Sequence, residues 1–117
     1  MEKFTVKLPL TGEYLTTVRL TTGGLCALVG FDVDGAEDFK VGVTESLLIL
    51  KRNGFTTAEI EYSVSDSLAC KVTGVGACGE KEDSFEDEIS CALLSALVKN
   101  TQIKKDADKV VGIEFAY

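Results

Sequence analysis

The chain has 117 residues, 45% of them hydrophobic, and a net charge of −7. This length suits one domain with a real core and is too short for two, so we expect a single domain over residues 1–117. The acidic balance disfavours binding to nucleic acid or anionic membrane, because phosphate contacts need clustered Lys and Arg. Proteins or small molecules are the expected partners.

No run of about eighteen or more apolar residues is present, and the start MEKFTVKLPL lacks the features of a signal peptide. We therefore expect a cytoplasmic protein. The four cysteines, Cys26, Cys70, Cys78 and Cys91, form no CxxC pair, and the chain has no histidine to complete a mixed zinc site. We expect reduced, mostly buried thiols and no metal site.

The first part of the chain predicts a strand and then an amphipathic helix. Residues 3–10, KFTVKLPL, alternate as in a short strand, and residues 11–31 follow with apolar positions at helical spacing. Gly23 and Gly24 lie inside this helical pattern. Each costs an exposed helix about 1 kcal/mol relative to alanine. They therefore indicate close packing, a bend or an end of the helix. The apolar face consists of Leu15, Val18, Thr22, Leu25 and Val29.

Residues 31–55 predict a loop and a second helix, with Asp34 as a possible N-cap and Gly54 as the C-terminal stop. Residues 56–76 contain two alternating runs around the turn SDS, which is typical of a β-hairpin. In its first strand Ile60, Tyr62 and Val64 share one face.

The rest of the chain predicts a charged loop, a third helix and two strands around the turn KDADK. Ser84 and Asp87 approximate a capping box at the start of that helix. The class is therefore α+β, a two-layer α/β sandwich with three helices on one face of a mixed, mainly antiparallel sheet. The expected apolar face of the third helix is Ile89, Ala92, Leu93, Ala96 and Leu97, and that of the last strand is Val111, Ile113 and Phe115.

The second helix is apolar on two sides. At about 100° per residue, Glu45, Ile49 and Arg52 fall on one side with Val41 and Leu48, and the other side carries only apolar residues. A helix of this kind is covered on both sides. We expect the sheet to cover one, and a lid, a ligand or a loop of the chain to cover the side with Glu45.

The order of elements and the stretch EDFKVGVTESLLILKRNGF, residues 37–55, resemble the anti-sigma factor serine kinases of the gyrase, histidine kinase and MutL (GHKL) superfamily. The resemblance spans nearly the whole chain and implies a reduced Bergerat-like ATPase fold. It implies that Glu45 stands at the catalytic glutamate. Ile49, one turn later, stands where the family has the asparagine that holds Mg²⁺. Arg19 matches an arginine that touches the sigma factor and its antagonist.

The same resemblance implies that the nucleotide site is degenerate. Isoleucine cannot bind Mg²⁺, which requires oxygen ligands. The family's adenine-binding aspartate has no counterpart among Val72, Thr73 and Gly74, although glycines remain at Gly74, Gly76 and Gly79. An ordinary turn also explains spaced glycines. In the glycine-rich lid, where relatives bind phosphate at a helix N-terminus, six carboxylates stand against Lys81: Glu80, Glu82, Asp83, Glu86, Asp87 and Glu88.

Two readings of function follow. The first is an anti-sigma-factor-like regulator that has lost ATP binding, needs no cofactor and acts by protein contact through the helix of Arg19, possibly as a homodimer. The second is a divergent serine kinase that still uses ATP and Mg²⁺. In the first reading Glu45 is a relic paired with Arg52 or a backbone donor, and in the second it is in use.

Overall fold

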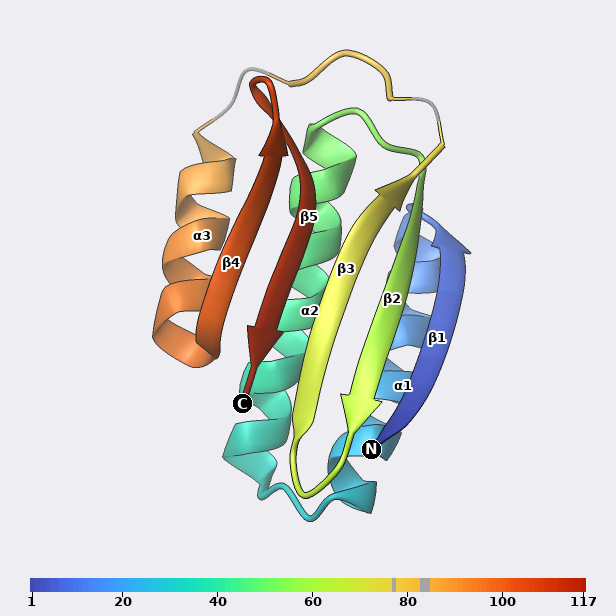
Figure 1. Cartoon of the computed structure of the whole chain (residues 1–117), viewed down its shortest axis with the longest axis vertical. Coiled ribbons are helices and arrows are strands. Elements are labelled where there is room, and N and C mark those ends of the chain that lie inside the picture. Colours follow the sequence, from blue (N-terminus) through green and yellow to red (C-terminus); the bar gives the residue numbers. More distant parts are fainter. Residues whose placement is uncertain (77, 83–84) are drawn as a thin grey trace.

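The computed structural model describes residues 1–76, 78–82 and 85–117. Five strands and three helices follow one another as β1 (Glu2–Pro9), α1 (Gly12–Leu28), α2 (Val33–Arg52), β2 (Thr57–Val64), β3 (Leu68–Val75), α3 (Glu86–Leu97), β4 (Lys99–Asp106) and β5 (Lys109–Ala116) (Figure 1).

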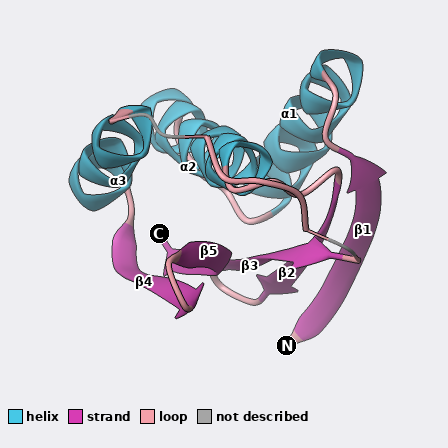
Figure 2. Ribbon diagram, turned by 90° about the horizontal axis from the view of Figure 1, so that it is seen from above, coloured by secondary structure: helices cyan, strands magenta, loops and turns pink. Residues whose placement is uncertain are grey.

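The strands form one sheet in the order β1-β2-β3-β5-β4, and every neighbouring pair is antiparallel. Figure 2 shows the three helices together on one face of this sheet, with the opposite face uncovered. The α+β layered fold is therefore confirmed. The sheet is wholly antiparallel rather than mixed, because each strand between β1 and β4 pairs only with antiparallel neighbours.

The core lies between the helices and the sheet. Ile60, Tyr62 and Val64 are buried together on β2, as their alternation predicted. Burial raises the pKa of the Tyr62 phenol and of the Cys70 thiol on β3, so both groups remain protonated. Gly42 allows α2 to approach β5, since a Cβ atom there would lie 3.2 Å from the ring of Phe115.

The four cysteines are free, but burial is less general than expected. Cys26 and Cys70 are buried, Cys91 is half-buried and Cys78 is exposed. Within the described residues, no helix combines the length and the apolar character that a membrane crossing requires.

α1 runs unbroken through Gly23 and Gly24. A Cβ atom at Gly23 would lie 3.3 Å from Cε of Lys40 on α2, whereas Gly24 has open space around it. Close packing is thus the reason for the first glycine only. Thr22 is buried on the inner face of α1 and shares a hydrogen bond of 2.6 Å with the hydroxyl of Tyr62.

The N-cap of α2 is Asp32, and the prediction of Asp34 is wrong. The Asp32 carboxylate accepts a hydrogen bond of 2.7 Å from the backbone N–H of Gly35, so the helix begins two residues before the expected cap. The end of α2 was predicted correctly. Arg52 is its last residue, and Gly54 follows with a φ of +101°, a conformation that favours glycine.

The predicted inner face of α3 is wrong. The helix buries Ser90 and Leu94, while Ile89 and Leu93 are exposed. Its N-cap is Phe85, which makes no side-chain capping bond, and Ser84 of the expected capping box lies outside the described residues. α3 has apolar residues on both its inner and outer sides, so periodicity alone pointed to the wrong one.

Candidate functional site

Glu45 lies at the contact between α2 and α3, where it is half-buried. Its Oε1 accepts a hydrogen bond of 3.1 Å from the hydroxyl of Ser90 on α3. The expected cover of this side of α2 is thus a neighbouring helix and not a lid, a ligand or a loop. The expected partner is also different, because the donor to Glu45 is a serine hydroxyl.

Arg52, two turns after Glu45 on α2, connects the same serine to an acid. Its Nη2 donates to Oγ of Ser90 at 2.6 Å, and its Nε donates to Oδ1 of Asp87 at 2.6 Å. The Ser90 hydroxyl therefore accepts from Arg52 and donates to Glu45. One guanidinium and two carboxylates meet around one hydroxyl, which balances charge at a largely buried contact.

Asn53 extends this network to the sheet. Its side chain is fully buried, and its Nδ2 donates at 2.8 Å both to Oδ2 of Asp87 and to the carbonyl of Ile49. Its Oδ1 accepts a hydrogen bond of 2.9 Å from the backbone N–H of Val110 on β5. The amide thereby ties α2, α3 and β5 together and satisfies groups that would otherwise be buried without partners.

The described part of the loop between β3 and α3 lies on the C-terminal end of α2. The backbone N–H groups of Glu82 and Gly79 donate to the carbonyls of Arg52 and Gly54, at 2.7 and 2.9 Å. Lys109 on β5 donates to the carbonyl of Gly79. The last carbonyls of a helix have no partners within it, so this loop supplies them.

The positions that the resemblance assigned to nucleotide are dispersed. Ile49 is fully buried in the core one turn after Glu45. Thr73 alternates with the buried Val72 on β3, so its side chain belongs to the uncovered face of the sheet, away from Glu45. Gly74 packs under Phe55, whose ring would lie 2.6 Å from an added Cβ atom. Only Ile49 shares a helix face with Glu45.

The two other glycines have separate roles. Gly76 has a φ of +81°, which fits the turn that ends β3. Gly79 lies against Gly54, where a Cβ atom on Gly54 would come within 2.5 Å of the carbonyl oxygen of Gly79.

The carboxylates between β3 and α3 differ in their surroundings. Asp87 is half-buried in the network, Glu86 is mostly exposed 3.6 Å from the Arg52 guanidinium, and Glu80, Glu82 and Glu88 are exposed. Asp83 lies outside the described residues. A groove of about 500 Å³ adjoins Asp87, with Lys81 and Lys105 among the residues that line it. Its lining therefore mixes charges of both signs.

Arg19 is exposed on α1, as expected. It lines a shallow groove of about 170 Å³ with Thr16, Leu20 and Lys40. Together with Lys40 it lowers the pKa of Glu37, chiefly through the hydrogen bond that Lys40 donates to that carboxylate. This surface lies on α1, apart from the Glu45 network on α2 and α3.

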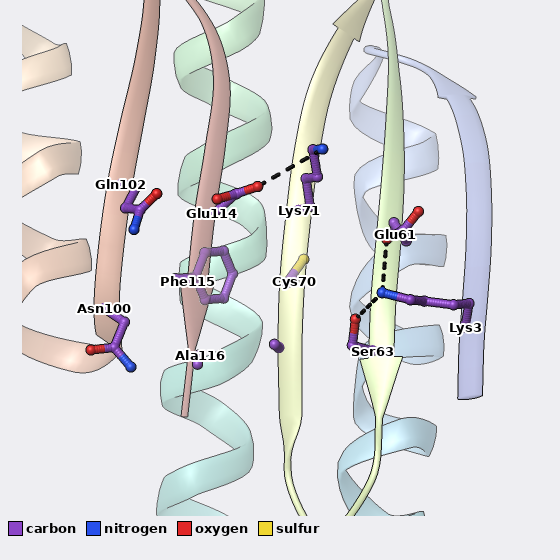
Figure 3. A pocket seen from close by; sticks show the side chains of 11 residues that line it. Lys3, Glu61, Ser63, Cys70, Lys71, Asn100, Gln102, Glu114, Phe115 and Ala116 are labelled. Atoms are coloured by element: carbon purple, nitrogen blue, oxygen red, sulfur yellow. Dashed lines mark hydrogen bonds and ion pairs between the residues drawn. The ribbon is translucent and has the colours of Figure 1, made fainter. Parts of the chain in front are cut away.

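A second polar region lies on the uncovered face of the sheet, where a groove of about 340 Å³ crosses the strands (Figure 3). Lys3 on β1 contacts both Glu61, at 3.2 Å, and Ser63, at 2.9 Å. Glu114 on β5 lies 3.9 Å from Lys71 and 3.2 Å from Lys104. These cross-strand pairs are solvent-exposed and make no contact with the helix layer.

Sequence reasoning missed Ser90 and Asn53, the two neutral members of the network. Both sit next to residues that were noticed, namely Ile89 in the apolar pattern and Arg52 on the Glu45 side. Their partners come from other elements, so no local spacing pointed to them. The available signal was weak: a serine in the middle of an apolar helix, and an asparagine directly after the last helical arginine.

Comparison with curated proteins finds similarity to one kind of enzyme. The serine-protein kinases RsbW of Listeria innocua serovar 6a and Listeria monocytogenes serovar 1/2a are each 29% identical to the chain over 87 residues, which make up 69% of this chain and 55% of the relative. RsbW of Bacillus thuringiensis is 38% identical over 45 residues, which are 38% of this chain and 28% of the relative.

No protein-family model matches the chain. The chain spans about half the length of the Listeria relatives it matches. With its layered α+β fold and its helix bearing Glu45, the chain is therefore similar over about two thirds of its length to serine-protein kinases RsbW.

Proposed function

We propose that the protein is an anti-sigma-factor-like regulator that acts by contact with another protein and does not use ATP. The observation that supports this most is the contact of α3 with the Glu45 side of α2. Ser90 binds Glu45, and Asp87 binds Arg52 and Asn53. The polar groups of α2 that face outward at this point are thus occupied by the chain's own side chains.

The residue types at the neighbouring positions support the same proposal. Ile49 offers no oxygen to Mg²⁺ and is fully buried. No carboxylate stands at Val72, Thr73 or Gly74 to hold an adenine amino group. The loop before α3 adds exposed acids, which repel a triphosphate.

A specific observation favours one alternative, a divergent serine kinase. The similar proteins are named serine-protein kinases, and Glu45 is retained with a hydroxyl hydrogen-bonded to its carboxylate. In this alternative α3 moves away from α2 before nucleotide binds, which breaks the bonds of Arg52 to Asp87 and Ser90. Such an enzyme would transfer phosphate from ATP and Mg²⁺ to a serine of an antagonist protein.

For the protein contact, we propose the exposed surface of α1 around Arg19. Its neighbours Thr16 and Leu20 are exposed beside it, so a partner can reach both polar and apolar atoms. The net charge of −7 favours basic partner surfaces, such as the DNA-binding regions of a sigma factor.

The test of this contact is binding of purified sigma factors from the source organism to the native chain and to Arg19→Glu. We expect Arg19→Glu to weaken the complex at least tenfold without changing the melting temperature, because the side chain is exposed. Lys7→Glu on β1 is the matched control, since it makes the same charge change at another exposed site. Equal binding by native and Arg19→Glu chains would place the contact elsewhere.

A further inference from the structure

The face of α3 that points away from the rest of the molecule is apolar. α3 buries Ser90 and Leu94, and on its opposite side Phe85 and Ile89 are 71% and 51% exposed. Ala92 and Ala96 are exposed on the same side. Single exposed apolar residues are ordinary on a protein surface, but four aligned on one helix face form a continuous strip. We call Phe85, Ile89, Ala92 and Ala96 the outer seam.

The spacing of the outer seam is that of a helix–helix contact. Its four members are four, three and four residues apart, as in the heptad pattern by which two helices pack along a common line. α3 is the outermost helix of the layer, with α2 on its inner side (Figures 1 and 2). Among the described elements, none covers the seam.

The order of side-chain sizes along the seam selects the kind of helix that fits. The large residues Phe85 and Ile89 come first, and the small residues Ala92 and Ala96 follow. A second identical helix in antiparallel orientation sets Phe85 opposite Ala96 and Ile89 opposite Ala92 across a two-fold axis. A parallel copy would instead set large against large and small against small, which packs poorly.

Charge favours the same orientation. The charged residues of α3, which are Glu86, Asp87 and Glu88, all lie in its first turn, and the exposed Lys99 follows its last turn. Antiparallel packing brings the acidic turn of each helix toward the Lys99 end of the other. Parallel packing would bring the two acidic turns together, and like charges repel.

We propose that the outer seam is an interface with a second copy of this chain, in which two α3 helices pack antiparallel. This inference does not depend on the proposed function. Two helices of 12 residues each bury less surface than a standard interface of roughly 1,200–2,000 Å². The dimer is therefore reversible, and it forms as the protein concentration rises through the micromolar range.

Sedimentation velocity tests the interface. The native chain is expected to shift from monomer to dimer with concentration, and Ile89→Glu and Ala92→Lys are each expected to remain monomeric. An equimolar mixture of the two variants is expected to dimerise again, because the new carboxylate at position 89 of one chain faces the new ammonium group at position 92 of the other. The second layer of that heterodimer keeps its native Ile89–Ala92 contact.

The matched control is Leu20→Glu on α1, a similar change at a side chain that is 75% exposed, and it is expected to dimerise like the native chain. Circular dichroism melting of each variant separates loss of the interface from loss of the fold. A native chain that stays monomeric at all concentrations would overturn the proposal. So would a dimer that survives Ile89→Glu, or a variant mixture that stays monomeric.

Discussion

The contact between α2 and α3 and the uncovered face of the sheet hold the same kinds of charged groups in different surroundings. Arg52 and Asp87 meet at 2.6 Å with side chains 12% and 18% exposed, whereas Lys3 and Glu61 meet at 3.2 Å with side chains 54% and 39% exposed. Charges that have left water depend on each other, while exposed charges still have water as a partner. The comparison teaches that burial decides how much a pair matters.

The largest expected effect is that of Arg52→Ala. This change leaves the largely buried carboxylate of Asp87 without its cation and Ser90 without one of its donors. We expect a loss of about 3 kcal/mol in the free energy of unfolding, measured by urea denaturation. Lys51→Ala, the exposed neighbour on the same helix turn, is the control and is expected to change stability by less than about 0.5 kcal/mol. A loss below about 1 kcal/mol for Arg52→Ala would mean that water reaches this contact freely.

Asn53→Ala is expected to have a smaller but clear effect. It removes the acceptor of the Val110 N–H and a donor to Asp87, and we expect a loss of about 2 kcal/mol from groups left without partners. Hydrogen exchange of the Val110 amide measures this directly, because that N–H loses its protection while the amide of Ile113 on the same strand retains it. Unchanged protection of Val110 would contradict the role given to Asn53.

The smallest expected effect is that of Lys3→Ala on the uncovered face. Lys3 contacts Glu61 and Ser63, but all three groups remain reachable by water, so we expect a change within about 0.5 kcal/mol. The measurement is the same denaturation curve at low and at high salt. A loss as large as that of Arg52→Ala would remove the distinction between the two regions.

The sequence was sufficient for elements whose pattern has one interpretation. The alternation around SDS predicted the β2–β3 hairpin, and Gly54 marked the end of α2, because only a glycine-like conformation stops the helix there. The layered fold followed from the order of such elements. In contrast, Asp32 and Asp34 are both able to cap α2, and the choice between them depends on the path of the preceding loop.

The site was predictable only in part. The sequence showed that the Glu45 side of α2 needed a cover, since that side is as apolar as the other. It did not show which element covers it. α3 is apolar on both sides, so its orientation is decided by Ser90 meeting Glu45 and Arg52 and by Asp87 meeting Asn53. These are contacts between residues more than thirty positions apart, which local patterns do not encode.

Titration of the purified chain with ATP and Mg²⁺, followed by thermal unfolding, tests most directly the proposal that the Glu45 region no longer uses nucleotide. A ligand at 100 times its Kd stabilises a fold by about 2.7 kcal/mol, which shifts the melting temperature by several degrees. We expect no shift with ATP and Mg²⁺ beyond the shift with Mg²⁺ alone. A clear rise that requires ATP would contradict the account and favour the divergent serine kinase.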